Sequence, residues 1–229
     1  MLDLALITAR GGSVGLPRKN VLLLGDIPLI GWTIRGALSC GIFKRVVVST
    51  DDEEIALCAR AFGAETPFVR PAELASSTAN SIDVVHHALR HVDHVENFAL
   101  IQPTSPFRNA RHLREAADMF ADGEAGSVIG VAKSKPVQWL YQIDHSGFLR
   151  PVVEGADQIS RRQDAAAPVC PNGSLYITSK AQVARSNSLF APRSRPYTMD
   201  AISSIDIDDI NDFELAEAVV TAGLRKIDL

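Results

Sequence analysis

A glycine-rich segment near the amino terminus carries the strongest chemical signal in the chain. Residues 9–20 have the sequence A-R-G-G-S-V-G-L-P-R-K-N and follow an apolar run at 4–7. Glycines allow a sharp turn and close approach to a ligand, and successive N–H groups in such a turn bind anions. The cations Arg10, Arg18 and Lys19 lie in the same segment. A glycine-rich turn after the first strand of an α/β domain is typical of a nucleotide phosphate site, so we expect phosphate binding here.

Two aspartates near the carboxyl terminus form a second polar cluster. Residues 204–209 have the sequence S-I-D-I-D-D, and a strand over 204–207 would put Asp206 and Asp208 on the same side. Two carboxylates on one side suit a hard divalent cation that bridges phosphates, such as Mg²⁺. A solvated strand end, with Asp209 as the cap of a following helix, is the alternative interpretation.

Two further polar clusters follow predicted strands. The turn Q-P-T-S-P-F-R at 102–108 is fixed by two prolines, and we expect it to present Gln102, Ser105 and Arg108 as hydrogen-bonding groups. The second cluster is R-R-Q at 161–163, followed by P-N-G-S-L-Y at 171–176. Each could be structural when taken alone. Because ligands bind beyond the carboxyl ends of strands in α/β sheets, their joint occurrence favours one site for an anionic ligand.

The elements that must position these residues alternate between strand and helix. We expect strands at 4–7, 45–49, 98–102, 127–131, 174–178 and 204–207. We expect helices at 28–38, between a cap at Asp51 and Gly63, at 81–95, at 110–120, and from Asp209 toward Gly223. This order predicts an α/β fold with a mostly parallel, doubly wound, Rossmann-like sheet and helices on both faces.

The segment 133–167 does not fit this alternation. It contains Trp139, Tyr141, Phe148 and a polar run, and we expect short antiparallel strands that leave the sheet. An insertion of this size in a compact domain is often a lid or a dimerisation arm. We therefore predict a single domain over 1–229 with an inserted arm at about 133–167.

Composition limits the class of protein. The 229 residues carry a net charge of −4, which argues against general binding of nucleic acid but leaves an anionic small substrate open. The three cysteines are an odd number without C-x-x-C spacing, which fits a reducing compartment. We find neither a signal peptide nor an apolar run near the roughly 20 residues that span a bilayer. These features predict a cytoplasmic protein with no membrane partner.

Taken together, the motifs resemble the acylneuraminate cytidylyltransferases, the CMP-sialic acid synthetases. The segments that carry the resemblance, in family order, are A-R-G-G-S-V-G-L-P-R-K-N, V-V-V-S-T-D-D-E-E-I-A, R-P-A-E-L-A-S-S-T-A-N-S, L-I-Q-P-T-S-P-F-R, R-R-Q, P-N-G-S-L-Y and S-I-D-I-D. The resemblance implies a nucleotidyltransferase that couples CTP to the anomeric hydroxyl of a nonulosonic acid and releases pyrophosphate. It also implies a homodimer with shared active sites, in which the arm reaches into the neighbouring subunit.

The resemblance assigns roles to residues on the nucleotide side. It implies that the CTP triphosphate is held by Arg10, Ser13, Lys19 and Asn20. It places Arg70, Ala79 and Ser81 near the cytosine and ribose. Asp206 and Asp208 match aspartates that bind Mg²⁺, with Mn²⁺ as a possible substitute. Arg10, Lys19 and Asp208 are the expected catalytic residues, and Asp208 is one candidate for the general base.

The resemblance also assigns roles on the sugar side. Gln102 matches a residue near the reacting centre, and Arg162 matches a basic residue that faces the sugar carboxylate. Tyr176, Leu189 and Phe190 match the wall of a pocket for the glycerol-like tail and the N-acyl group.

Three positions depart from the family pattern. Val14 replaces a lysine near the β- and γ-phosphates, and Arg18 could compensate because a guanidinium grips phosphate oxygens. Gln138 replaces a lysine near the sugar carboxylate, and Cys170 replaces a frequent arginine. These changes leave three alternatives open: an acylneuraminate substrate, the same reaction on legionaminate, pseudaminate or Kdo, and a catalytically silent nucleotide-binding homologue.

Overall fold

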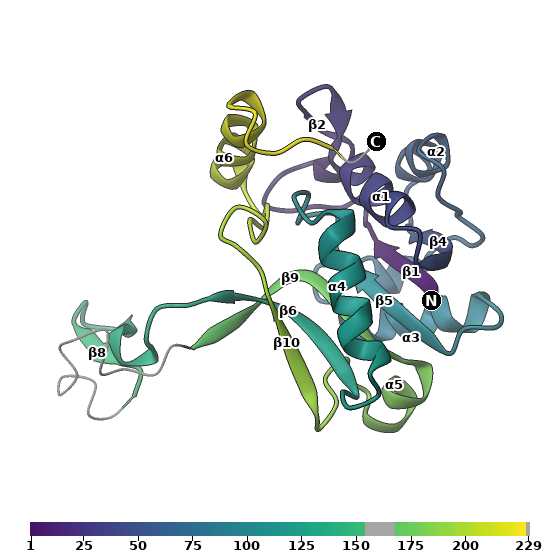
Figure 1. Cartoon of the computed structure of the whole chain (residues 1–229). Coiled ribbons are helices and arrows are strands. Elements are labelled where there is room, and N and C mark those ends of the chain that lie inside the picture. The colour runs from purple at the N-terminus through teal and green to yellow at the C-terminus, as the bar shows by residue number, and fades with distance from the viewer. Residues whose placement is uncertain (154–167, 228–229) are drawn as a thin grey trace.

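A six-stranded mixed sheet forms the centre of the computed structural model, which describes residues 1–153 and 168–227 (Figure 1). In chain order its strands are β1 (Leu2–Thr8), β4 (Phe43–Ser49), β5 (Asn97–Ile101), β6 (Ser127–Lys133), β9 (Val169–Ser179) and β10 (Ser194–Thr198). Their spatial order is β10-β6-β9-β5-β1-β4. β1 runs parallel to β4 and β5, and β10 runs parallel to β6. Only β9 is antiparallel to its neighbours in this sheet, so the mostly parallel α/β fold is confirmed.

Helices cover both faces of the sheet, as a doubly wound fold requires (Figure 1). One face packs against α1 (Leu29–Ser39), α2 (Glu53–Ala61) and α4 (Ala110–Ala121), and the other against α3 (Ser81–His91) and α5 (Lys180–Ser186). Alternation along β1 shows why: Ala5 and Ile7 pack with the first set, and Leu4 and Leu6 with the second. Parallel strands buried on both faces are therefore apolar throughout.

Helix caps correct one prediction and confirm another. Asp52, not Asp51, caps α2, because its Oδ1 accepts a hydrogen bond from the Ile55 N–H at 3.0 Å. The Asp51 carboxylate instead accepts the N–H of Gly11. Asp209 caps α6 (Ile210–Thr221) in a capping box, as predicted. Helix α3 ends at His91, four residues before the predicted end.

The strand predicted at 204–207 is wrong, and a different strand was missed. Residues 201–208 form turns and irregular backbone with no strand partner among the described residues. The missed strand is β10, whose Pro196 argues against a strand from sequence. Because β10 is an edge strand, the missing N–H of proline is tolerated there. Smaller elements are β2 (Leu23–Leu24), β3 (Ile27–Pro28), and the 3₁₀ helices η1 (Lys19–Val21), η2 (Ala72–Leu74) and η3 (Val137–Trp139).

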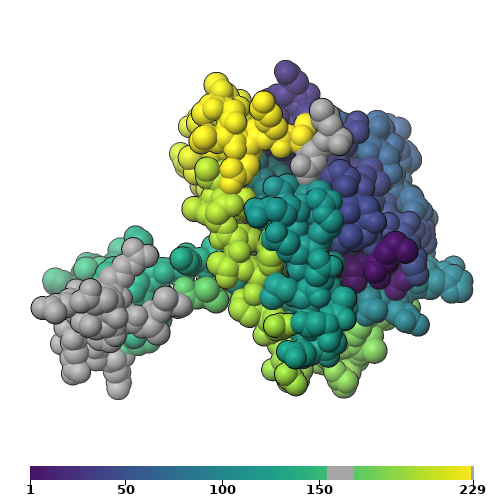
Figure 2. Space-filling model, viewed as in Figure 1, coloured from purple at the N-terminus to yellow at the C-terminus, as the bar shows by residue number. Residues whose placement is uncertain are grey.

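The segment after β6 leaves the sheet, and its described part contains the antiparallel strands β7 (Tyr141–Ile143) and β8 (Leu149–Pro151). Figures 1 and 2 show this arm as a projection joined to the body by a narrow neck. Ile143, Phe148 and Leu149 are exposed on it. Residues 154–167, which include Arg162, lie outside the described residues. The single-domain organisation and the dimerisation role of the arm stay predictions. No described helix is long and apolar enough to cross a membrane.

Candidate active site

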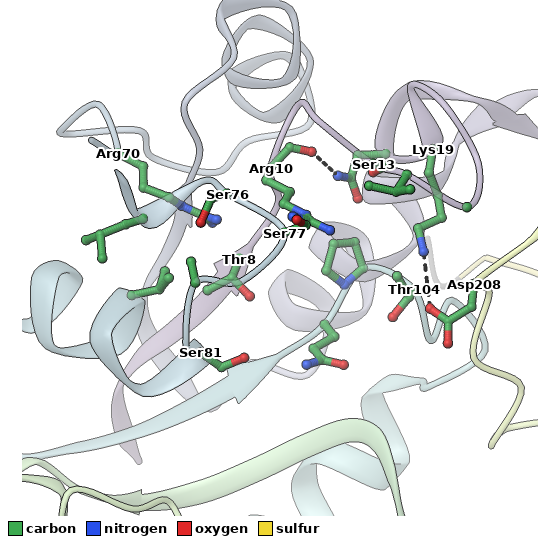
Figure 3. Close-up of a pocket in the computed structure, with 18 of the residues that line it drawn as sticks. Thr8, Arg10, Ser13, Lys19, Arg70, Ser76, Ser77, Ser81, Thr104 and Asp208 are labelled. Carbon is green, nitrogen blue, oxygen red and sulfur yellow. Dashed lines mark hydrogen bonds and ion pairs between the residues drawn. The ribbon is translucent and has the colours of Figure 1, made fainter. Parts of the chain in front are cut away.

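A polar cavity of about 350 Å³ opens at the carboxyl ends of β1 and β5 (Figure 3). It brings together ten of the residues singled out from the sequence: Arg10, Ser13, Lys19, Asn20, Arg70, Ala79, Ser81, Gln102, Asp206 and Asp208. Figure 3 shows the side chains of Arg70, Arg10 and Lys19 spread along one side of this cavity. We call it the first cavity. The cavity lies at the edge of the sheet where ligands bind in parallel α/β folds.

Several lining residues were missed from sequence. Hydroxyl groups reach the first cavity from Thr8, Ser76, Ser77 and Thr104. Thr8 ends β1, where a polar side chain could have been expected at a ligand edge. Serine and threonine are common in every loop, so residue type alone gave no signal for the other three.

One apolar cluster anchors three of the loops that supply polar groups to the first cavity. Leu16 from the glycine-rich loop, Phe107 from the 102–108 turn and Ile207 from the acidic segment all pack into it. The cluster also contains Trp32 of α1, whose ring meets Phe107 edge-on at a centroid distance of 5.8 Å. Each loop therefore inserts one buried apolar side chain, and its polar neighbours are left at the cavity.

This anchoring, and not a strand, places the two aspartates together. Ile207 is fully buried, and its N–H donates to the carbonyl of Thr104 at 2.8 Å. Asp206 and Asp208 flank Ile207 in sequence and both line the first cavity. The prediction that the two carboxylates lie on the same side is thus correct, although they do not belong to a strand.

Two glycines permit the close approach of these segments. A Cβ at Gly15 would overlap the carbonyl oxygen of Asp208, so the glycine-rich loop meets the acidic segment only because a side chain is absent. Gly173 has φ +72°, and a Cβ there would lie 2.7 Å from Gln102 Oε1 and 3.1 Å from Asp206 Oδ2. At both positions the absence of a side chain therefore lets neighbouring segments of the site pack closely against the backbone.

Lys19 connects the loop to the acidic segment. Its ammonium group donates to the carbonyl of Ile207 and lies 3.5 Å from Asp208 Oδ1 (Figure 3). The side chain is nearly buried, whereas that of Asp208 is 81% exposed. The cation is therefore held beside the two carboxylates at the wall of the first cavity.

Arg70 is fixed at the end of β4. Its Nε donates to Ser49 Oγ at 3.1 Å, and a second guanidinium nitrogen donates to the Ser49 carbonyl. Burial, opposed by Asp51 and reinforced by Arg10, lowers the pKa of Arg70 to about 10. The guanidinium therefore stays charged at neutral pH.

The acidic pair fits a divalent cation. Burial raises the pKa of Asp206, and the nearby Asp208 acts in the same direction, against a hydrogen bond from Thr104 and the charge of Lys19. Asp206 Oδ1 is buried and has no hydrogen-bond partner among the described residues. No three acidic, histidine or cysteine side chains of the described part gather into a metal cluster. Mg²⁺ is commonly bound by one or two carboxylates together with substrate phosphates, so the two aspartates suit it.

A second cavity of about 240 Å³ adjoins the first. Tyr176, Leu189 and Phe190 line it, so the three predicted wall residues come together. The rings of Tyr176 and Phe190 meet edge-on at 6.2 Å. Ser81 and Gln102 line both cavities. Sequence reasoning missed three polar lining residues: Asn80, Asn187 and Ser188.

Arg18, Gln138 and Cys170 line neither cavity, whereas Val14 lines the first. The guanidinium of Arg18 pairs with Asp52 at 2.6 Å and with Glu54, so it does not replace the charge lost at Val14. Val14 itself is 75% exposed at the edge of the first cavity. Gln138 and Cys170 line neither cavity, although Cys170 is close enough to contribute to the raised pKa of Tyr176.

Ser105 and Arg108 are buried behind the 102–108 turn, so the expectation that they face a ligand is wrong. Arg108 Nη1 donates to the carbonyls of Ser174 at 2.6 Å and Gln102 at 3.3 Å. Complete burial lowers the pKa of Arg108 to about 9. This guanidinium supports the turn that carries Gln102.

Comparison with known proteins gives a consistent result. The model of a family described as cytidylyltransferase matches residues 4–165. An N-acylneuraminate cytidylyltransferase of Escherichia coli is 38% identical over 229 residues, which cover 99% of this chain and 54% of the relative. N-acylneuraminate cytidylyltransferase A of Danio rerio is 35% identical over 93% of this chain and 49% of its own length. The chain thus spans about half the length of the curated relatives it matches.

Solved structures support the fold. A CMP:2-keto-3-deoxy-manno-octonic acid synthetase, solved in complex with CTP, has a TM-score of 0.71 at 15% identity and covers 96% of this chain and 99% of its own. A 4-diphosphocytidyl-2C-methyl-D-erythritol synthase from Anaerococcus prevotii has a TM-score of 0.66 at 13% identity, with 96% and 98% covered. At such identities the likeness concerns the fold alone.

Proposed function

Because the chain belongs to the cytidylyltransferase family, we propose that it couples CTP to the anomeric hydroxyl of a nonulosonic acid, giving a CMP-sugar and pyrophosphate. One observation carries this proposal: two adjoining cavities of different character share Ser81 and Gln102. The first is lined by cations and hydroxyl groups, which suit a nucleoside triphosphate. The second has an aromatic and aliphatic wall, which suits an N-acyl sugar acid. The names of the curated relatives favour an acylneuraminate as that acid.

The first cavity would stabilise charge that develops on the phosphate oxygens. Arg10 and Lys19 would neutralise that charge, and Ser13 and the loop amides would fix the geometry. Arg70 and Ser81 would hold the nucleoside end. Phosphoryl-type transfer needs little covalent chemistry from a protein, so positioning and charge are the main contributions.

Asp206 and Asp208 would hold Mg²⁺, with Mn²⁺ as a substitute. The bound cation would supply neutralising charge to the triphosphate oxygens. The protein contributes the two carboxylates, and Lys19 beside Asp208 limits their mutual repulsion when no cation is bound.

The reaction forms a bond between the anomeric oxygen and the α-phosphorus and breaks the bond from that phosphorus to the pyrophosphate oxygen. Gln102, at the junction of the cavities, would orient the anomeric centre for in-line attack. The hydroxyl proton needs an acceptor, and we assign that role to the exposed carboxylate of Asp208. Arg162 stays a prediction for the sugar carboxylate.

The assembly and location are part of the same proposal. The arm exposes Tyr141, Ile143, Phe148 and Leu149, which a second copy of the chain would cover in a homodimer. All three cysteines are free thiols, which suits a reducing, cytoplasmic location.

Pyrophosphate release from CTP and Mg²⁺ across a panel of sugar acids tests the function. We expect the highest rate with N-acetylneuraminate. A negligible rate with this acid and a high rate with legionaminate, pseudaminate or Kdo would change the substrate and keep the reaction. Binding of CTP without release on any acid would favour a catalytically silent homologue.

A further inference from the structure

Two aspartates hold the glycine-rich loop from outside the first cavity. They follow β4 directly, and neither lines the cavity. Asp51 Oδ1 accepts the N–H of Gly11 at 3.0 Å. Asp52 Oδ2 accepts Nη1 of Arg18 at 2.6 Å, and the carboxylate of Glu54 pairs with the same guanidinium. The loop is therefore tied near both of its ends.

The loop needs such ties because its own sequence makes it flexible. Three glycines within five residues have a large conformational entropy to lose. Arg18 has φ +59°, a left-handed conformation that costs energy for a residue with a Cβ. The close fit of Gly11 is equally specific, since a Cβ there would lie 2.7 Å from Asp52 Oδ2.

Asp52 also ties the loop to a rigid element. Its other oxygen, Oδ1, caps α2 through the Ile55 N–H, and its own N–H donates to Thr50 Oγ1 at 3.1 Å. One residue thus joins the segment after β4, the start of α2 and the cation of the loop. A carboxylate this close to a triphosphate site would repel the ligand unless its charge were offset, and Arg18 offsets it.

We propose that Asp51, Asp52 and Arg18 form a loop clamp that holds the backbone amides of residues 11–15 in the geometry that binds the triphosphate. The three are positioning residues, because they act through the loop and do not touch the ligand. The effect on CTP rests on the proposed function. The effect on the loop does not.

Hydrogen exchange of the ligand-free protein tests the clamp without any nucleotide. Asp52→Asn keeps an amide oxygen for the cap of α2 and removes one of the two carboxylates that pair with Arg18, and Arg18→Gln removes the guanidinium itself. In both variants we expect amides of residues 11–18 to exchange about fivefold faster, as loss of a partly exposed ion pair allows. Arg60→Gln is the matched control, since it breaks the 2.7 Å ion pair with Glu53 on the same helix. Unchanged loop exchange in both clamp variants, or equal acceleration in the control, would overturn the clamp.

Nucleotide binding gives the second readout. In each clamp variant we expect the dissociation constant and the KM for CTP to rise about fivefold, with the KM for the sugar acid and the thermal midpoint unchanged. The double variant should bind CTP no more weakly than Arg18→Gln alone, because that substitution already removes the ion pairs of Arg18 with both Asp52 and Glu54. Multiplied effects, or a rise in the sugar KM instead, would contradict the clamp. If the clamp variants showed faster loop exchange but the wild-type protein bound no CTP, the clamp would be supported and the proposed function overturned.

Discussion

The two cavities differ in how their walls are built. The first is lined by charged and hydroxyl side chains from several loops, and three of those loops share one buried apolar cluster. The second is lined by side chains of β9, α3 and residues 187–190, and Tyr176 and Leu189 pack on the separate apolar cluster beneath α3. The first cavity thus presents charged groups from loops that share a buried anchor, whereas the second presents an aromatic and aliphatic wall. Substitutions of residues that line only the second cavity should leave the first intact.

The largest effect is expected where the charge of the first cavity is concentrated. Asp208→Asn keeps the side-chain volume and removes one carboxylate, so kcat for pyrophosphate release should fall about 10³-fold with little change in the sugar KM. Circular dichroism and the thermal midpoint serve as the control for folding. A kcat near the wild-type value would show that the carboxylate of Asp208 takes no part in the reaction.

Gly15→Ala tests the contact between the loop and the acidic segment. The new Cβ would overlap the carbonyl oxygen of Asp208 and push the two segments apart, so kcat/KM for CTP should fall about 100-fold. Gly12→Ala is the matched control, because nothing lies within 4 Å of a Cβ there and the loss should stay below about threefold. Equal losses in both variants would show that loop flexibility, and not this contact, matters.

Val14→Lys adds a cation at the edge of the first cavity. The dissociation constant for CTP, measured by calorimetry, should fall about fivefold, and this gain should shrink at high salt. Leu57→Lys on α2 is the control, since Leu57 is exposed and lies outside both cavities. An unchanged affinity would mean that the phosphates are already neutralised at this edge.

Asp206→Asn should stabilise the fold while it impairs turnover. Burial raises the pKa of Asp206 above its unfolded value, so the folded state binds the proton more tightly and ionisation costs stability as pH rises. Removing the charge should raise the free energy of unfolding at pH 7 without divalent cations. The gain should shrink as pH falls toward 4. Urea unfolding at several pH values measures it, and a destabilised variant at pH 7 would contradict the assignment.

The sequence predicted the elements that obey a simple pattern. The buried strands and the cap at Asp209 follow from local chemistry. The alternation I-D-I-D predicted a strand at 204–207, and this strand is absent. The two aspartates lie on the same side because Ile207 is buried and bonded to Thr104, and no local sequence pattern reveals such tertiary contacts. Asp51 and Asp52 are neighbours of the same type, so only the turn after β4 decides which one caps α2.

The cavity residues were predictable because their motifs end strands or resemble family motifs. Arg18 and Arg108 were misplaced for a physical reason. A cation in a phosphate-binding motif is expected to face the phosphate, yet the guanidinium of each of these two residues is already paired with other groups of the protein. Arg18 pairs with carboxylates of α2, and Arg108 donates to two carbonyls behind its turn. Of these partners, Asp52, Glu54 and Ser174 belong to segments far away in sequence.

The assignment of CTP to the first cavity and of the sugar acid to the second is tested most directly by a kinetic comparison of Arg10→Gln with Phe190→Ala. Arg10 lines only the first cavity and Phe190 only the second. We predict that Arg10→Gln raises the KM for CTP about tenfold and leaves the KM for the sugar acid unchanged, as expected for a lost charge-assisted hydrogen bond. Phe190→Ala should raise the KM for the sugar acid about tenfold and leave that for CTP unchanged. If both variants raised the KM of the same substrate, the assignment of one cavity to each substrate would be wrong.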